Sequence, residues 1–274
     1  MVSFPNCKIN LGLYITEKRA DGFHNIETCF LPVTLRDALE VIPTETNKLE
    51  FTNVGTPIVG DISKNLCVTA YHLLKDAYPD KVYPVHILLN KQIPMGAGLG
   101  GGSADGACTL LMLNEYFNLA LSKDQLIEFA LMLGSDCPFF ILNTPSIGKG
   151  RGEQLSALPI DLKGYTILLI NPGIHISTKW AFEQINPAYR EQSIGDILLQ
   201  PISTWKHALV NDFEAPIVKA YPVIDSIKKE LYSKGAVYAA MTGSGSTVFG
   251  IFGQMEESLF SFPKNYMVRK VKAI

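Results

Sequence analysis

The stretch Pro94-Met-Gly-Ala-Gly-Leu-Gly-Gly-Gly-Ser103 places five of the chain's 22 glycines within seven residues. Glycine has no Cβ, so such a run can adopt left-handed backbone conformations and approach a ligand closely. Before it, residues 82–89 have the apolar, β-branched character of a strand. After it, apolar residues recur at helical spacing from Ser103 to Phe117. The run therefore joins a predicted strand to the N-terminus of a predicted helix.

This setting predicts an anion site at the glycine run. The first turn of a helix has unpaired N–H groups and a partial positive charge. A glycine-rich loop at that end can surround a phosphate with backbone donors. A flexible linker is the alternative, but the flanking strand and helix disfavour it.

Three nucleotide motifs compete for these residues. Gly96-x-Gly98-x-x-Gly101 matches the dinucleotide fingerprint, but it lacks the required acidic residue at the end of a second strand about 20 positions later. The phosphate loop of common ATPases ends in Gly-Lys-Ser/Thr, whereas Gly102 is followed by Ser103 and Ala104. The remaining match is Pro-x-x-x-Gly-Leu-Gly-x-Gly-Ser.

The rest of the chain predicts a mixture of strands and helices. Apolar and polar residues alternate over 6–15, which indicates a half-buried strand with Lys8 and Asn10 on one face. Ser63 is the expected N-cap of a helix reaching Ala77, and Ser122-x-x-Gln125 is a capping box for a helix ending near Gly134. Further strands are expected at 23–33, 165–170 and near 237, 248 and 268, and further helices near 178–185, 211–220 and 223–233.

Composition excludes several classes of protein. The 274 residues are 47% hydrophobic and 18% charged, which predicts a folded chain of one large or two modest domains. The net charge of 24 − 26 = −2 is too balanced to hold the molecule on nucleic acid or a membrane. The five cysteines form no CxxC pair, the uncharged stretch 235–255 contains five glycines, and a strand pattern begins by residue 6. We therefore expect reduced thiols and a cytoplasmic protein with no leader, membrane span or zinc site.

Residues 94–105 resemble the second motif of the GHMP small-molecule kinases, in which this loop wraps the phosphates of ATP. More narrowly, the chain resembles the branch of that family that phosphorylates 4-diphosphocytidyl-2-C-methyl-D-erythritol. The matching segments occur in the same order and span nearly the whole chain: residues 5–11, 19–24, 98–105, 133–140, 150–153, 211–214 and 243–246.

The resemblance implies an α+β fold of two-layer sandwiches. It implies an N-terminal nucleotide-binding domain like domain 2 of ribosomal protein S5, over residues 1–158, and a ferredoxin-like C-terminal domain over 159–274. It further implies ATP with Mg²⁺, and phosphorylation of the erythritol 2-hydroxyl in the non-mevalonate route to isoprenoid precursors. We expect a monomer or homodimer, with no nucleic-acid or membrane partner and no metal held by the protein alone.

Two residues carry the implied chemistry. The resemblance makes Asp136 the general base and places Lys8 beside it and the γ-phosphate. An opposite charge favours the ionised carboxylate, and a cation also stabilises the charge that develops during phosphoryl transfer. Without the resemblance, Asp136 would be interpreted as a turn or cap carboxylate and Lys8 as a solvated charge.

The resemblance also implies contacts for both substrates. Phe23 and His24 would hold cytosine; the family usually has Tyr at position 23. Phe182 would add a second stacking ring, and Trp180 is the competing candidate. The alternative for Phe182 and for Trp180 is an aromatic residue of the core. Ala104 and Gly106 depart from the usual loop continuation. The expected acceptor contacts are Asn10, Phe23, His24, Asp136, Thr178, Phe182, Gly243 and Ser244; the expected ATP contacts are Asn65, Leu66, Lys91, Pro94, Gly96, Gly98, Leu99, Gly100, Gly101, Gly102 and Ser103.

Two other functions compete with this interpretation. Homoserine and mevalonate kinases share the expected fold but would lack the motif at residues 21–24. A noncatalytic nucleotide-binding protein would keep the glycine run without needing Lys8 and Asp136.

Overall fold

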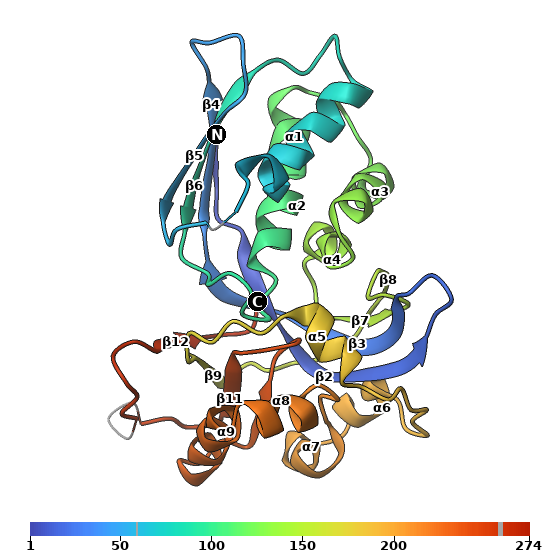
Figure 1. Cartoon of the computed structure of the whole chain (residues 1–274), viewed down its shortest axis with the longest axis vertical. Coiled ribbons are helices and arrows are strands. Elements are labelled where there is room, and N and C mark those ends of the chain that lie inside the picture. The colour runs from blue at the N-terminus through green and yellow to red at the C-terminus, as the bar shows by residue number, and fades with distance from the viewer. Residues whose placement is uncertain (59, 257–259) are drawn as a thin grey trace. The chain divides into compact units, whose positions relative to one another are not determined.

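The computed structural model describes residues 1–58, 60–256 and 260–274. The chain forms two compact units, each built from several segments (Figure 1). Unit 1 comprises Met1–Cys7, Leu35–Met95 and Gly100–Asn143, and unit 2 comprises Lys8–Thr34, Gly96–Leu99 and Thr144–Ile274. The expected division into consecutive domains after residue 158 stays a prediction.

Unit 1 is a four-stranded sheet with helices on one side (Figure 1). The strand order is β1-β4-β6-β5, with β4 antiparallel and β5 parallel to β6. The elements are β1 (Val2–Ser3), β4 (Ala38–Pro43), β5 (Glu50–Gly55), β6 (Val85–Lys91), a 3₁₀ turn η1 (Ile62–Lys64), and helices α1 (Leu66–Ala77), α2 (Gly101–Tyr116), α3 (Lys123–Leu133) and α4 (Cys137–Leu142).

Helix ends in unit 1 test the sequence predictions. The capping box of α3 is confirmed, since Ser122 and Gln125 bond reciprocally, and the helix ends at Gly134. The prediction that Ser63 caps α1 is wrong: Ser63 lies in η1, and Asn65 Oδ1 accepts from Cys67 N at 2.9 Å instead. Asparagine is an equally good N-cap, and here it stands next to the first helical residue.

Unit 2 contains two four-stranded sheets, with strand orders β2-β3-β7-β8 and β10-β11-β9-β12. Helices α8 and α9 cover the second sheet, and Ile224, Ile227 and Leu231 of α9 are buried in this core. The elements are β2 (Asn6–Lys18), β3 (His24–Arg36), β7 (Ser146–Lys149), β8 (Gln154–Ala157), β9 (Thr166–Asn171), β10 (Tyr238–Met241), β11 (Val248–Phe252), β12 (Met267–Val271), α5 (Thr178–Glu183), α6 (Ile194–Leu198), α7 (Ile202–Ala208), α8 (Glu214–Ala220) and α9 (Val223–Ser233).

Strand β2 corrects the expectation of a half-buried strand. Residues 6–15 are buried on both faces, and Lys8 and Asn10 are only 3% and 2% exposed. Segments distant in sequence cover the polar face: Lys8 N donates to Leu99 O at 3.0 Å, and Asn10 N donates to Thr242 Oγ1 at 2.9 Å. Alternation along one strand cannot reveal such a cover, because the covering residues come from elsewhere in the chain.

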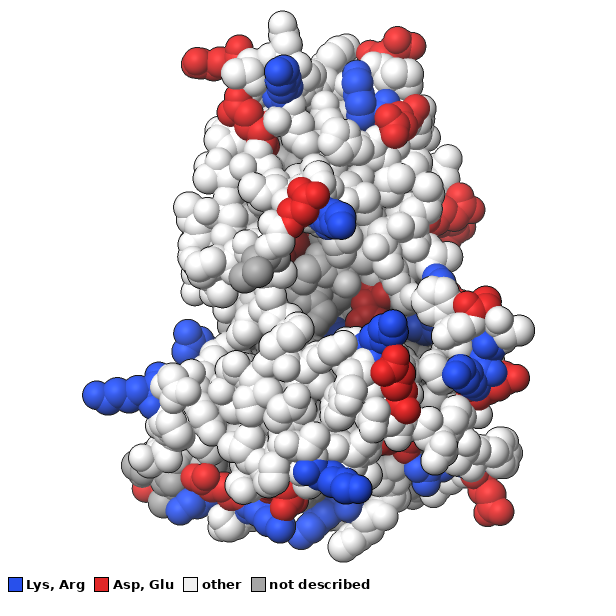
Figure 2. Space-filling model, in the orientation of Figure 1, with Lys and Arg blue, Asp and Glu red and all other residues white. Residues whose placement is uncertain are grey.

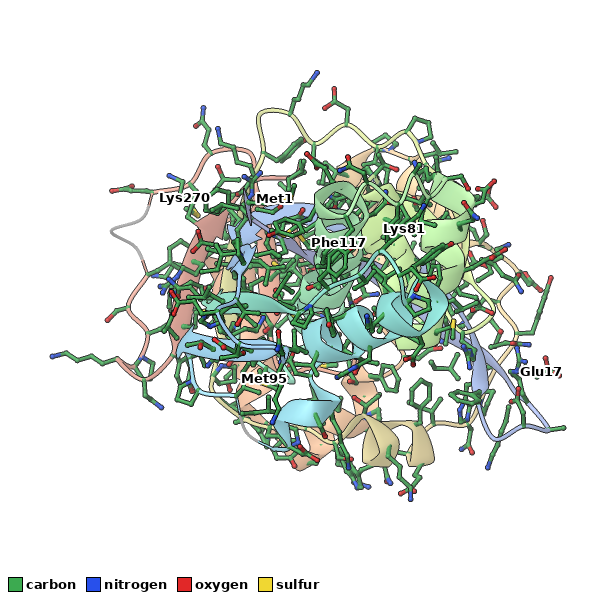
Figure 3. All side chains as sticks on the ribbon, turned by 90° about the horizontal axis from the view of Figure 1, so that it is seen from above. Met1, Glu17, Lys81, Met95, Phe117 and Lys270 are labelled. Carbon is green, nitrogen blue, oxygen red and sulfur yellow. The ribbon has the colours of Figure 1, made fainter. Side chains whose placement is uncertain are left out.

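The surface carries charges of both signs. Lys and Arg side chains are interspersed with Asp and Glu on the face shown in Figure 2, in keeping with the net charge of −2. Glu17, near the end of β2, projects at the periphery (Figure 3). In the described part of the chain, we find no helix with the length and apolar character needed to cross a bilayer.

Candidate active site

Lys8 is anchored on the glycine run. Its Nζ donates to Asn10 Oδ1 at 2.7 Å and to the Gly98 carbonyl at 3.1 Å, which confirms that Lys8 and Asn10 share a face. Thr242 Oγ1 lies within 3.2 Å of the same two oxygens. Asn10 Nδ2 also donates to Thr28 Oγ1 at 2.9 Å. This network holds a buried cation against the backbone that is expected to receive phosphate.

Two glycine turns meet at this network. Gly98 has φ +77°, and a Cβ on it would lie 2.1 Å from Thr242 O. Gly243 has φ +57° and faces Gly98, with its own Cβ position 3.1 Å from the Gly98 Cα. Thr247 N also donates to Ala97 O at 3.3 Å. Glycine is required at position 98 both by its conformation and by this close approach.

Replacing Gly98 with alanine is therefore expected to lower the free energy of unfolding by about 2–5 kcal/mol, from the left-handed backbone and the steric overlap together. Urea denaturation of the variant and the wild type measures this difference. Gly102→Ala is the matched control, because nothing lies within 4 Å of its Cβ position in α2. A glycine-to-alanine change inside a helix should instead stabilise by about 0.5–1 kcal/mol. Equal effects at the two positions would contradict the close approach at Gly98.

The segment 211–214 supports the second glycine turn. Asn211 Nδ2 donates to Met241 O at 2.8 Å and to Gly243 O at 2.9 Å. Glu214 Oε1 accepts from Met241 N at 2.6 Å, and Asp212 Oδ2 accepts from Ile15 N at 2.8 Å. The resemblance marked these residues without a role; in the structure, Asn211 and Glu214 hold the backbone of the turn facing Gly98, and Asp212 ties the segment to β2.

Helix α5 brings expected acceptor residues together. Ser177 caps the helix by accepting from Trp180 N, and Thr178 Oγ1 lies 3.0 Å from Ser244 Oγ. One turn later, Phe182 stacks on His24 with ring centroids 4.7 Å apart and planes 18° apart. Trp180 instead meets Tyr221 edge-on. The contact with His24 favours Phe182 over Trp180 as the second aromatic.

The turn before β3 presents Phe23 and His24. Arg19 and Asp21 form an ion pair at 2.8 Å, and Phe23 N donates to Asp21 Oδ1 at 3.1 Å. Phe23 is 51% exposed, so its ring is available to a ligand. Partial burial lowers the pKa of His24, and the nearby Lys18 lowers it further. His24 is therefore neutral around pH 7 and has one donor and one acceptor nitrogen.

In unit 1, a buried ion cluster lies between the end of β6 and the first turns of α2. Lys91 is 2% exposed and pairs with Asp37 and with Asp105, the latter at 2.8 Å. Asp37 Oδ1 also accepts from Gln92 N at 2.5 Å and Ile93 N at 2.8 Å. Asp105 belongs to α2, so the cluster ties the end of β6 to that helix. Sequence reasoning missed Asp37, which stands far from Lys91 along the chain.

Burial and neighbouring charges shift the pKa values of Lys91 and Asp105. Burial raises the pKa of Asp105 to about 8; Lys91 opposes this effect and Asp37 adds to it. Burial alone would lower the pKa of Lys91, but the attraction of Asp105 and Asp37 outweighs burial and raises it. Asp105 therefore takes up a proton at a higher pH than an exposed carboxylate does, because one buried cation faces two buried carboxyl groups.

Helix α1 explains one departure from the family loop. A Cβ on Gly106 of α2 would lie 2.7 Å from Leu66 Cβ, so the absence of a side chain at position 106 lets the two helices approach. Leu66 and Asn65 form the start of α1, where Asn65 acts as the cap. Their contact with ATP stays a prediction, as does that of Lys91.

Asp136 occupies the N-cap position of α4, but its side chain makes no capping hydrogen bond. This disfavours the interpretation of Asp136 as a helix cap. The next residue, Cys137, is hydrogen-bonded to Ser103 in the first turn of α2. Asp136 is therefore adjacent in sequence to a residue that contacts the predicted phosphate-binding turn. Burial raises the pKa of the Cys137 thiol to about 12, which disfavours thiol chemistry there.

The expected site residues fall in both units. Lys8 belongs to unit 2 and Asp136 to unit 1, and their pairing stays a prediction. Unit 2 brings together Lys8, Asn10, Gly98 and Gly243 in one network, and His24 with Phe182 and Thr178 with Ser244 in direct contacts. Gly96 and Leu99 also belong to unit 2, whereas Asn65, Leu66, Lys91, Pro94, Gly100, Gly101, Gly102 and Ser103 belong to unit 1.

Comparison with known proteins defines the class. The model of the GHMP kinases N terminal domain matches residues 65–144, and that of the GHMP kinases C terminal domain matches residues 194–261. The structure is similar to that of Methanococcus jannaschii mevalonate kinase, with a TM-score of 0.75 at 14% identity, over 100% of this chain and 98% of that one. The fold is that of the GHMP kinases, which confirms the predicted fold class.

Closer relatives narrow the assignment. The chain is 51% identical to a 4-diphosphocytidyl-2-C-methyl-D-erythritol kinase of Bacteroides fragilis over 94% of both proteins, and 49% identical to one of Cytophaga hutchinsonii over 97% of both. A crystal structure of 4-(cytidine 5'-diphospho)-2C-methyl-D-erythritol kinase is similar with a TM-score of 0.80 and 27% identity, over 99% of both chains. The chain belongs to the 4-diphosphocytidyl-2-C-methyl-D-erythritol kinase family.

Proposed function

We propose that this protein transfers the γ-phosphoryl group of ATP to the 2-hydroxyl of 4-diphosphocytidyl-2-C-methyl-D-erythritol, a step of the non-mevalonate route to isoprenoid precursors. Relatives of that name match over nearly the whole chain. The observation that carries the proposal is the hydrogen bond from Lys8 Nζ to Gly98 O, at 3.1 Å. It fixes a cation on the glycine run that would hold the triphosphate.

ATP would bind along the glycine run and the start of α2. Gly100 is the N-cap of α2 with φ 70°, so the N–H groups of Gly101, Gly102 and Ser103 are the unpaired donors of its first turn. Such donors suit phosphate oxygens. Pro94, Gly96, Gly98 and Leu99 would complete the loop, and Asn65, Leu66 and Lys91 would lie towards the adenosine.

Magnesium would enter with the nucleotide. The described residues contain no group of three or more His, Cys, Asp or Glu side chains that could hold a metal ion by themselves. Mg²⁺ usually binds to substrate phosphates with one or two carboxylates and keeps several waters. When bound, it would neutralise charge on the phosphates.

The cytidine and the diphosphate of the acceptor would bind in unit 2. Phe23, His24 and Phe182 offer aromatic faces and a neutral imidazole to cytosine. The hydroxyls of Thr178 and Ser244, together with Gly243, would receive the diphosphate. Asn10 and Asp136 would orient the erythritol hydroxyl.

The chain's own chemistry would then be a proton transfer and charge stabilisation. Asp136 would accept the proton of the 2-hydroxyl as its oxygen attacks the γ-phosphorus. Lys8 would stabilise the negative charge on the transferring group, because Asn10 and Gly98 O hold its ammonium in place. No covalent enzyme intermediate is needed.

An ADP-coupled assay with three acceptors tests this function. We expect ADP release with 4-diphosphocytidyl-2-C-methyl-D-erythritol and little with homoserine or mevalonate. Turnover of homoserine or mevalonate alone would overturn the acceptor assignment. ATP binding without turnover of any acceptor would support a noncatalytic nucleotide-binding protein.

The proposal also includes the cellular location of the protein and its oligomeric state. None of the five cysteines forms a disulfide and all five are buried, and burial raises the pKa of Cys29 to about 12 and that of Cys108 to about 11. Inert thiols of this kind support a reducing cytoplasmic location. A monomer or homodimer stays the prediction for assembly.

A further inference from the structure

Arg151 lies on the ring of Phe23 and has no part in the proposed chemistry. Its guanidinium carbon is 4.6 Å from the Phe23 ring centroid. The family resemblance covers the segment 150–153 but assigns this side chain no role. A planar cation stacked on an exposed aromatic ring is a cation–π contact, which arginine makes more often than lysine.

The backbone around Arg151 is built to hold this position. The residue occupies the turn between β7 and β8, and β7 pairs with β3 through Thr28 and Gly148. Ile26 N, in β3, donates to Gly150 O at 2.7 Å, and Arg151 N donates to Glu153 Oε2 at 2.5 Å. The turn is therefore fixed to the strand that begins next to Phe23.

Neighbouring charges suit a guanidinium at this place. Hydrogen bonding to Arg19 lowers the pKa of Asp21, and the charge of Arg151 lowers it further. Asp21 also accepts from Phe23 N, so the carboxylate that attracts Arg151 is the one that shapes the turn carrying the ring.

We propose that Arg151 is a positioning residue for the nucleobase of the acceptor: it covers one face of Phe23 and holds the ring so that its other face can stack on cytosine. This inference rests on the proposed function. Phe23 is 51% exposed, so one covered face still leaves ring surface for a ligand. His24 already covers Phe182, so Phe23 is the more accessible of the two expected stacking rings.

Competition between Arg151 and cytosine for the same ring face would change the binding affinity in the opposite direction. If the guanidinium occupied the face that cytosine needs, the base would have to displace it, and removing Arg151 would tighten binding. The direction of the change in affinity therefore separates support of the ring from competition for it.

The test measures cytidine monophosphate binding by calorimetry, together with steady-state kinetics, for Arg151→Met. We expect affinity for this probe to fall about two- to fivefold, the size of an exposed cation–π contact. KM for the acceptor should rise by the same factor, while kcat and KM for ATP stay unchanged. Lys149→Met is the matched control, because it removes a cation of the same hairpin that pairs with Glu27. That variant should bind the probe as the wild type does.

A double-mutant cycle identifies the contact responsible. In a Phe23→Leu background, Arg151→Met should cause no further loss of binding, because the ring it supports is gone. A full additional loss in that background, or unchanged or tighter binding by Arg151→Met alone, would overturn the role of Arg151. Failure of the wild type to bind cytidine monophosphate would also overturn the cytidine site and, with it, the proposed acceptor.

Discussion

Asp136→Asn is expected to lower kcat by about 10²- to 10⁴-fold, the usual range for loss of a general base. Asparagine has nearly the same shape but cannot accept the proton of the acceptor hydroxyl. The Asp136 side chain does not cap α4, so the substitution removes no capping bond. The KM values for both substrates should stay close to those of the wild type, and the melting temperature, measured alongside, separates a loss of catalysis from a loss of stability. Steady-state kinetics with 4-diphosphocytidyl-2-C-methyl-D-erythritol measure the effect.

The control for this prediction is Asp124→Asn. Asp124 is an exposed carboxylate in the first turn of α3, within the same unit. Its loss should leave kcat unchanged and cost at most about 1 kcal/mol of stability, the usual size of the attraction between an exposed carboxylate and the positive end of a helix. Near-normal turnover by Asp136→Asn would reduce Asp136 to a residue that positions the substrate.

Lys91→Met is expected to lower the free energy of unfolding by about 3–5 kcal/mol, because it leaves buried carboxylates without their cation. Lys91, which is 2% exposed, pairs with Asp37 and Asp105. Asp37 also accepts hydrogen bonds from the backbone N–H groups of Gln92 and Ile93. Urea or thermal denaturation measures the loss. A change below about 1 kcal/mol, the size of an exposed ion pair, would show that the cluster is solvated.

Asp105→Asn is the matched variant for the same cluster. Because burial raises the pKa of Asp105 to about 8, the asparagine resembles the protonated form that burial favours and should cost much less than Lys91→Met. The folded pKa lies above the ordinary value of 3.8, so the wild-type stability contributed by Asp105 is complete at low pH and is lost as pH rises towards 8. Asp105→Asn should flatten that pH dependence. An equal loss of stability in the two variants would show an ionised Asp105.

Sequence reasoning succeeded where structure depends on neighbours along the chain. The glycine run, the capping box at Ser122 and the stop at Gly134 are all local features, and the structure places them where their residue types predict. The helix after the run begins at Gly101, two residues before Ser103, because Gly100 in the left-handed conformation acts as its N-cap. A helix end that is predicted from the sequence can be wrong by one or two residues when several neighbouring residues could serve as the cap.

Long-range contacts account for what the sequence did not show. The burial of Lys8 depends on Gly98 and Thr242, which approach it from distant parts of the chain. The pairing of Asp37 with Lys91 spans 54 residues, and that of Arg151 with Phe23 joins two hairpins. No spacing rule connects such residues. Acid and basic residue types indicate which side chains could pair, but only the fold selects the partners.

Phosphorus NMR of the reaction product tests the central claim most directly. With ATP, Mg²⁺ and 4-diphosphocytidyl-2-C-methyl-D-erythritol, the wild type should produce ADP and a new phosphomonoester resonance on the erythritol, in equal amounts. Lys8→Met should bind the cytidine end of the acceptor normally and form the new resonance at least 10²-fold more slowly, as expected when a donor to the transition state is lost. ADP released without a phosphomonoester on the erythritol, or an undiminished rate from Lys8→Met, would contradict phosphoryl transfer guided by Lys8.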